Sequence, residues 1–236
     1  METTELIEIL ARDAAPLRPQ AAPWLRAAIW FAVSAAYVAV LIAAMSPNGN
    51  RLASIHLSRF WLEQAAALGT GLAAAGAALL SVIPGRSRGW RVIPAIPLAG
   101  WLAILVSGCL RDWMARGAAG LLVHADWPCM MAMLMGGVVP IAGMMLMVRR
   151  GAPLAPIATA LFVGLAGAAM SSVVACMSRP APHPTTMTVV VWHLGTLLAM
   201  VAVVAGMGPR LLGWPMSARL AAALANASTH GSRRHQ

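Results

Sequence analysis

The chain has 236 residues, of which 60% are hydrophobic and 10% are charged, and its mean hydropathy is +0.75. Soluble globular proteins contain about 45–50% apolar and about 25% charged residues, so this composition excludes a soluble globular domain. The net charge of +10 comes from 17 arginines with no lysine, scattered singly or in pairs between apolar runs. Such spacing is typical of membrane-flanking anchors and argues against direct nucleic-acid binding. We therefore expect a polytopic membrane protein.

Residues 1–22 precede the first apolar run and predict a short cytoplasmic amphipathic helix, which begins at Thr3 or Thr4 and stops at Pro16. Its acids outnumber its one arginine, Arg12, so anionic lipid should repel it. One interpretation is that the helix binds a basic cytoplasmic protein by helix-in-groove recognition; the alternative is that it packs against arginines of the bundle. The candidate partner-binding residues are Glu5, Leu6, Ile7, Glu8, Leu10 and Asp13.

Six apolar runs are long enough to cross a membrane, since a spanning helix needs about 20 residues. The predicted fold is therefore all-α: a bundle of six transmembrane helices within residues 23–210, followed by a partly disordered cytoplasmic tail over 211–236. Strand-type alternation is absent from the sequence. The six predicted spans are 25–45, 60–83, 92–110, 129–148, 155–177 and 188–207.

The distribution of arginine predicts the orientation of this bundle. Twelve of the 17 arginines fall on one side and five on the other. Because cytoplasmic loops carry the arginine excess, we expect a multi-pass protein of the bacterial inner membrane with both termini in the cytoplasm. The outer loops are then about 46–59, 111–128 and 178–187.

This orientation places all three cysteines at the outer face, which meets an oxidising compartment. Cys109 ends the third predicted span, Cys129 begins the fourth and Cys176 ends the fifth. Cys129 and Cys176 could form a disulfide or a two-thiolate site for a soft metal ion, with His193 as a third ligand and Asp126 nearby. Equally, each cysteine could be a small buried hydrophobe and His193 a packing residue.

Two acid–tryptophan pairs lie in one outer loop, Asp112–Trp113 and Asp126–Trp127, and we expect both to fold that loop over the cysteine end of the bundle. No acid or arginine lies at the centre of a predicted span, where a transporter usually carries one. A small membrane transporter or metal-handling channel is therefore the alternative function, and a structural membrane subunit is the third.

Several short motifs follow one another along nearly the whole chain. They are Leu6-Ile7 with Leu10, Asp13 and Pro16; Gly108-Cys109 with Asp112-Trp113; Asp126-Trp127-Pro128-Cys129; Arg149-Arg150-Gly151-Ala152-Pro153 with Pro156; and Cys176 followed by Val191-Trp192-His193 and Gly195. In their order and topology they resemble the NrsF-type anti-sigma factors, the six-span bacterial inner-membrane negative regulators of an extracytoplasmic-function (ECF) sigma factor F.

The resemblance implies a non-enzymatic membrane protein that sequesters an ECF-type sigma factor through its cytoplasmic face. Release is expected when the outer cysteine pair, matched here by Cys129 and Cys176, responds to heavy-metal or oxidative stress. No resident cofactor is implied; a heavy-metal ion would act as inducer on those two cysteines, and membrane lipid is the other partner. The family tends to carry an acidic stretch after the second cysteine, whereas Met177-Ser178-Arg179-Pro180 follows here, which favours thiol oxidation over a carboxylate-assisted metal site.

Overall fold

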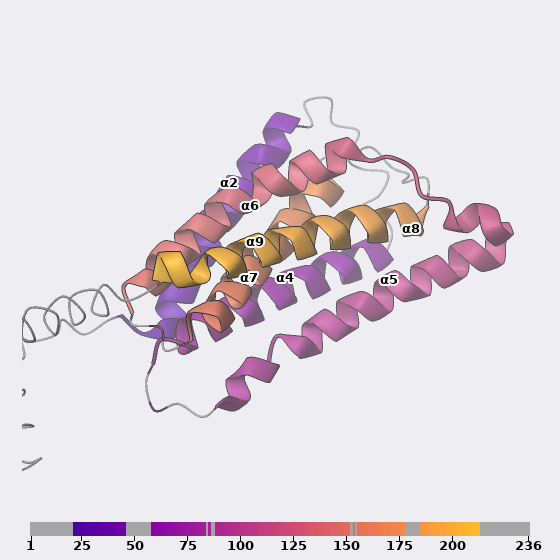
Figure 1. The fold of residues 1–236 in the computed structure, drawn as a ribbon. Helices are drawn as coiled ribbons and strands as arrows, with labels where there is room; N and C mark the ends of the chain where they lie inside the picture. Colours follow the sequence, from indigo (N-terminus) through magenta and orange to yellow (C-terminus); the bar gives the residue numbers. More distant parts are fainter. Residues whose placement is uncertain are drawn as a thin grey trace, which may run out of the picture.

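The structure is a computed structural model that describes residues 21–45, 58–83, 85, 88–151, 153, 155–177 and 185–212. Every regular element in these residues is helical, and the long helices run side by side as one bundle (Figure 1). The predicted N-terminal helix, with Glu5, Leu6, Ile7, Glu8, Leu10 and Asp13, lies outside the described residues, as does the tail beyond 212. The long helices are α2 (Pro23–Met45), α4 (Ser58–Leu80), α5 (Ala95–Arg116), α6 (Trp127–Arg149), α7 (Pro156–Met177) and α9 (Gly195–Leu212).

Four short elements complete the described part of the chain. Two 3₁₀ helices flank α5, namely η1 (Arg88–Val92) and η2 (Gly117–Leu121). The short helix α8 (Thr186–Val189) and the π-helical turn η3 (Val190–Leu194) lead directly into α9. The last three elements thus form one continuous helical stretch from Thr186 to Leu212.

Five helical stretches of the described chain are long and apolar enough to cross a membrane, which corrects the predicted six spans to five candidates. They are Pro23–Met45, Gly89–Leu121, Trp127–Arg149, Pro156–Met177 and Thr186–Leu212. The missing one is α4, which is 23 residues long but carries Glu63 and Gln64 and is rich in alanine and glycine. Its position in the bundle, against α7, α5 and α2, is nevertheless that of a sixth long helix.

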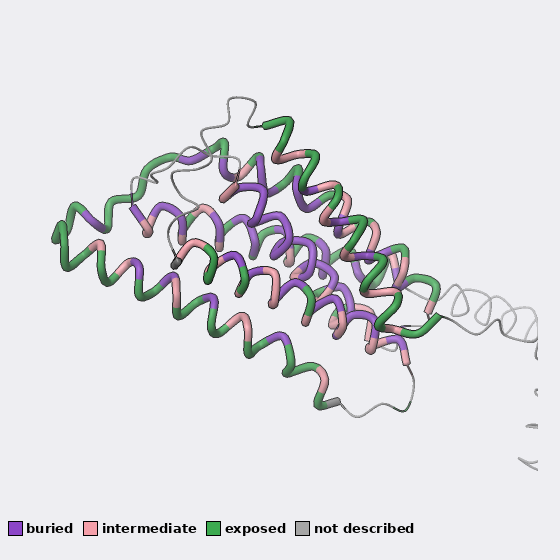
Figure 2. Tube along the Cα trace, turned by 180° about the vertical axis from the view of Figure 1, so that it is seen from behind, coloured by how far each residue is buried: buried purple, intermediate pink, exposed green. Residues whose placement is uncertain are grey.

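The central helix of the bundle is α7, which packs against α6, α9, α4 and α2. Most of its residues are buried, whereas α5 on the periphery is largely exposed (Figure 2). Small residues allow this packing: a Cβ on Gly136 of α6 would lie 2.8 Å from a methyl group of Val174 of α7, and a Cβ on Gly167 would collide with Ile141. Close backbone approach through small residues is the usual means of helix association in lipid, where water does not drive it.

Helix α2 is attached to α6 by side-chain donors that bond backbone carbonyls. Pro140 lies inside α6 and cannot donate a backbone hydrogen bond, which interrupts the helical ladder. The Trp30 indole N–H donates to the carbonyl of Pro140 at 2.8 Å, and the Tyr37 hydroxyl donates to that of Met135 at 2.8 Å. Near the other end of α6, the Arg26 guanidinium donates to the carbonyl of Met147.

The third long helix extends further than predicted. The sequence predicted a span ending at 110 and a loop over 111–128, but α5 continues to Arg116 and η2 follows it. Gly117 ends α5 with φ of 59°, a left-handed conformation that glycine adopts without steric cost. The predicted loop is therefore mostly helical, and only 122–126 lacks regular structure.

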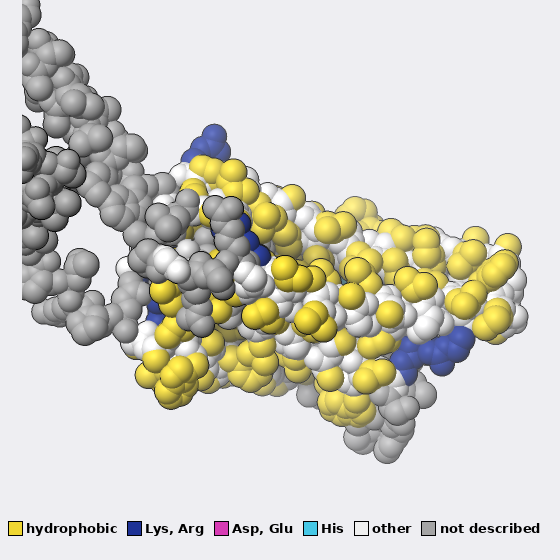
Figure 3. Space-filling model, turned by 90° about the horizontal axis from the view of Figure 1, so that it is seen from below, with side chains coloured by type: hydrophobic (Ala, Val, Ile, Leu, Met, Phe, Trp, Pro, Cys, Tyr) yellow, Lys and Arg dark blue, Asp and Glu magenta, His cyan; other side chains and the backbone are white. Residues whose placement is uncertain are grey.

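The visible surface of the bundle in Figure 3 is predominantly hydrophobic, with arginine side chains at a few places near its two ends. Exposed large apolar side chains occur on every long helix, among them Val33, Leu62, Val106, Leu146 and Leu198. An apolar belt between charged ends is the surface that a lipid bilayer stabilises.

Candidate functional site

The first turn of α6 is held in place by Asp126. This residue is the N-cap of the helix, and its buried carboxylate accepts a hydrogen bond from the backbone N–H of Cys129 at 3.2 Å. Pro128 occupies the first turn, where its missing N–H would have no helical partner anyway. The cap therefore sets the position of Cys129, whose side chain is fully buried.

His193 reaches the interior from the π-helical turn η3. The preceding helix α8 is N-capped by Thr185, whose hydroxyl accepts a hydrogen bond from the backbone N–H of Thr188 at 3.2 Å. A π-helical turn holds an extra residue and changes the direction of the side chains that follow, and such turns are frequent at functional sites. The imidazole of His193 is only 3% exposed, which is unusual for a polar side chain in a membrane helix.

The imidazole of His193 contacts both of the cysteines that the sequence singles out. Its Nδ1 lies 3.2 Å from Sγ of Cys129, and its Nε2 lies 3.5 Å from Sγ of Cys176. The three side chains come from the first turn of α6, the last turn of α7 and η3. The structure thus brings together Cys129, Cys176 and His193, and it places Asp126 one helical turn before Cys129.

Two thiols on one imidazole can react in ways that an isolated buried thiol cannot. Histidine can accept a thiol proton, and the resulting thiolate is the nucleophilic and metal-binding form. All three cysteines are thiols, and none is in a disulfide. Among the described residues no group of three or more His, Cys, Asp or Glu side chains has the arrangement of a metal site. The thiols and imidazole are soft donors, so the residue types suit a soft ion although the present geometry is not that of a closed site.

Trp127 lies at the rim of this cluster. Its ring packs edge-on against Trp192, with centroids 5.1 Å apart, and the Trp192 indole N–H donates to the carbonyl of His124 at 2.8 Å. Trp192 immediately precedes His193, so this pair helps to position η3. The accessory role of Trp127 remains a prediction; what the structure shows is its ring contact with Trp192.

The other predicted acid–tryptophan pair also contacts the cysteine end. The carboxylate of Asp112 on α5 accepts a hydrogen bond from the backbone N–H of Thr186 at 2.6 Å, which joins α5 to the start of α8. Cys109 lies one turn before Asp112 on α5 and is partly buried. The His193 contacts described above go to the other two thiols, those of Cys129 and Cys176.

Sequence reasoning missed two groups of residues at this end. A threonine network ties the 122–126 loop to α8: the Thr185 hydroxyl donates to the carbonyl of Leu122 at 2.7 Å, and Thr188 Oγ1 accepts from the backbone N–H of His124 at 3.1 Å. The signal for it was Thr185-Thr186 before an apolar run, which is a helix-start pattern. Arg59 of α4, which donates to the carbonyl of Ile104 at 2.8 Å, carried no signal beyond its charge.

Comparison with known proteins identifies one matching family. The family model for NrsF, described as negative regulator of sigma F, matches residues 10–214. The match covers the whole described bundle, including Cys129, Cys176 and His193. No curated protein and no solved structure matches the chain.

Proposed function

The chain belongs to the NrsF family of negative regulators of sigma F, and on that basis we propose that it holds an ECF-type sigma factor at the bacterial inner membrane and releases it when Cys129 and Cys176 react. The sigma factor is bound on the cytoplasmic face; this part of the proposal is supported by the arginine excess on the side where we expect both termini. The protein itself is not an enzyme; its output is the amount of sigma factor left for transcription.

The observation that carries this proposal is the contact of both thiols with His193. Hydrogen peroxide can oxidise the two thiols to a disulfide: the thiols lose two electrons and two protons, and the hydrogen peroxide takes them up and is reduced to two molecules of water. Alternatively, a soft heavy-metal ion can bind the two thiolates, with an imidazole nitrogen of His193 as a further ligand. Either reaction replaces the thiol–imidazole contacts and draws the first turn of α6 toward the last turn of α7.

A change at the outer end must reach the cytoplasmic side for the sigma factor to be released. The helix that starts at the site, α6, is bonded along its length to α2 through Tyr37, Trp30 and Arg26. Helix α2 begins at Pro23, directly after the N-terminal segment that we expect to bind the partner. A shift of α6 thus moves α2 and the segment joined to it, provided that the bundle has two packings between which the reaction selects.

The test is a transcriptional reporter for the sigma factor, measured in cells that carry the wild-type protein, Cys129→Ser or Cys176→Ser, before and after cadmium or peroxide. We expect each variant to keep the reporter repressed under stress, because one sulfur alone can neither close the disulfide nor complete the two-thiolate site. Cys109→Ser is the matched control and should respond as the wild type does. Normal induction in either variant would remove the cysteine pair from the input.

A further inference from the structure

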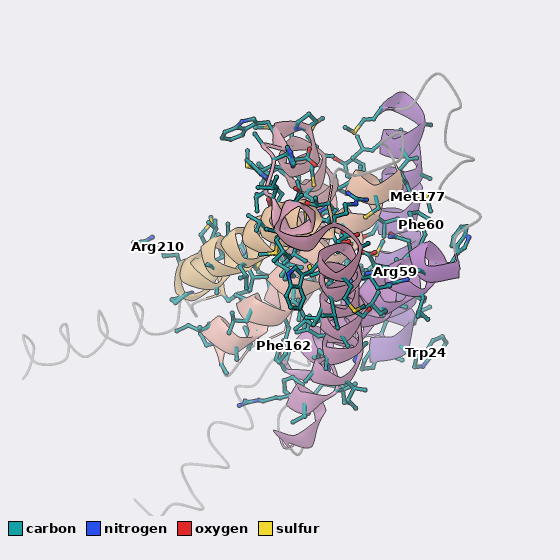
Figure 4. All side chains as sticks on the ribbon, turned by 90° about the vertical axis from the view of Figure 1, so that its right-hand side faces the viewer. Trp24, Arg59, Phe60, Phe162, Met177 and Arg210 are labelled. Carbon is teal, nitrogen blue, oxygen red and sulfur yellow. The ribbon has the colours of Figure 1, made fainter. Side chains whose placement is uncertain are left out.

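A cavity of about 400 Å³ with several charged side chains in its lining opens beside Cys176. It lies between the first turns of α4, the C-terminal half of α5, the end of α7 and α8, and Cys176 forms part of its wall. Figure 4 views the bundle from this end, where Arg59 and Phe60 of α4 are seen near Met177, the residue after Cys176. The cavity therefore gives access to one of the two sulfurs.

Basic side chains outnumber acidic ones around this cavity. The charged residues in its lining are Arg59, Arg111, Arg116, Glu63 and Asp112. Asp112 is already bonded to the backbone N–H of Thr186 at 2.6 Å, and it also interacts electrostatically with Arg59 and Arg116. Glu63 interacts with Arg59. The cavity thus has a net positive charge, and arginine is the side chain best suited to bind oxyanions.

The guanidinium of Arg59 is held in a defined place. One of its nitrogens donates to the carbonyl of Ile104 at 2.8 Å, and the group lies over Gly108 of α5, where a Cβ would collide with it. The absence of a side chain at Gly108 therefore leaves room for the guanidinium of Arg59. An arginine fixed by hydrogen bonding and packing is a preorganised anion ligand.

The two thiols differ in their access to the cavity. Cys176 is partly exposed and lines it, whereas Cys129 is fully buried behind the shared imidazole of His193. A molecule that enters the cavity meets the sulfur of Cys176 first. Cys129 is then placed to react second, with a group already attached to its neighbour.

We propose that this cavity is an anion-selective vestibule that brings small anionic thiol-reactive ligands to Cys176. A role of the vestibule in regulation rests on the proposed function, but its preference for anionic reagents at Cys176 does not. Clefts lined by one sign of charge raise the rate of association of the opposite ion by about 10- to 1,000-fold, and the mixed lining here, with its excess of arginine, places the expected effect at the low end of that range.

The probe is a pair of thiol reagents of similar size and opposite charge, 2-sulfonatoethyl and 2-trimethylammonioethyl methanethiosulfonate. With either reagent, Cys176 gives its proton to the buffer, and its sulfur attacks the sulfenyl sulfur. A new S–S bond forms, the bond to the sulfonyl group breaks, and methanesulfinate leaves with the electron pair. The reaction needs no other oxidant, so the rate reports access and local charge.

The experiment measures both rates at Cys176 by peptide mass spectrometry, on the full chain in neutral detergent. The ratio of anionic to cationic rate is compared with that of a small free thiol. We expect the ratio at Cys176 to be higher by about tenfold or more. Arg111→Gln and Arg116→Gln should each lower it, while Arg210→Gln, at the opposite end of the bundle, should leave it unchanged. Equal ratios at Cys176 and the free thiol would overturn the proposal.

Two further measurements keep the result decisive. If a glutamine variant fails to fold, the wild-type ratio should still fall as salt is raised, because salt screens charges at the mouth of a cavity. A ratio that does not change with salt would contradict the proposal.

The second measurement compares the ratio in lipid nanodiscs with and without anionic phosphatidylglycerol. A ratio that persists in both supports a vestibule for small anions, whereas its loss with anionic lipid would assign the arginines to lipid headgroups. None of these readouts involves the sigma factor, so failure of the proposed function would leave them unchanged.

Discussion

At the scale of single residues, His193 is the one on which the cluster depends. Its Nδ1 lies nearest to Sγ of Cys129, and its Nε2 lies 3.5 Å from Sγ of Cys176 and 3.8 Å from Sγ of Cys129. A neutral imidazole has one N–H and one acceptor nitrogen, so it can accept a proton from one thiol while it donates to the other. Replacement of His193 therefore affects both cysteines at once.

We predict that His193→Asn slows the reaction of Cys129 and Cys176 with a neutral alkylating reagent by at least about tenfold, because an amide cannot take up the thiol proton. The rate is measured for each cysteine by mass spectrometry in detergent. Cys109 serves as the internal control, and its rate should not change. Unaltered rates at the other two cysteines would show that the imidazole only fills space.

Asp126 is a second single residue with a predictable effect, because it caps α6 and stabilises the folded protein. Asp126→Ala removes the cap of α6 and should lower the free energy of unfolding by about 1 kcal/mol, whereas Asp126→Asn, which keeps an acceptor, should cost only a few tenths. Thermal unfolding of the two variants in one detergent compares them directly. An equal loss in both would mean that the negative charge, and not the hydrogen bond to Cys129, matters.

The residues of the cluster were only partly predictable. Cys129, Cys176 and His193 were candidates because soft or ionisable side chains near the ends of apolar runs are rare and the family pattern contains them. The contact of both thiols with one imidazole depends on the extra residue of η3, which hydropathy does not reveal. The sequence could not identify Arg59 as a site residue, because the position of its guanidinium depends on the space beside Gly108 of a different helix.

At the scale of helices, α6 and α7 approach each other through glycines. Gly167→Ala should lower the free energy of unfolding by about 1–3 kcal/mol, because the added methyl group would collide with Ile141 in a well-packed interior. Gly206→Ala is the matched control: it lies in α9 with nothing within 4 Å of the added Cβ and should be neutral or slightly stabilising. Equal effects of the two substitutions in a thermal unfolding experiment would argue against a tight α6–α7 contact.

The bonds between α2 and α6 give a prediction about signal transmission. The double variant Trp30→Phe, Tyr37→Phe keeps an aromatic ring at both positions but removes both donors. Each lost bond should cost about 0.5–1.5 kcal/mol, and the smaller ring at the buried position of Trp30 adds a loss of packing. We expect thiol reactivity to stay normal while release of the sigma factor under peroxide is weakened, because α2 no longer follows α6. Trp24→Phe, which removes an indole N–H at an exposed position of α2, is the control. Full release in the double variant would rule out this route.

Hydropathy predicted the places of the long helices because each apolar run needs its own backbone hydrogen bonds in lipid. Hydropathy predicted the ends of these helices less well. The charged residues from Arg111 to Arg116 resemble a loop in the sequence, but they extend the third helix beyond Leu110. The helix ends only at Gly117. The α4 run was counted as a span, but Glu63 and Gln64 make it less apolar than the other five.

At the scale of the whole molecule, the proposed input and output lie at opposite ends of the bundle. The thiols and the arginine-lined cavity lie at one end, and the loop between α6 and α7, with Arg149 and Arg150, lies at the other. The family match spans both ends, which fits a regulator whose two faces work together. Length and composition alone excluded a soluble protein, but no composition could distinguish a regulator from a transporter; that distinction came from ordered motifs.

The most direct test of the account is to isolate the full-length protein from its native cells with a mild detergent, before and after peroxide or cadmium, and to identify the proteins bound to it by mass spectrometry. The account predicts that an ECF-type sigma factor is recovered from untreated cells and lost after treatment, and that it is retained after treatment in Cys129→Ser and Cys176→Ser. If no sigma factor is recovered from untreated cells while the protein is intact and in the membrane, sequestration at the membrane is wrong.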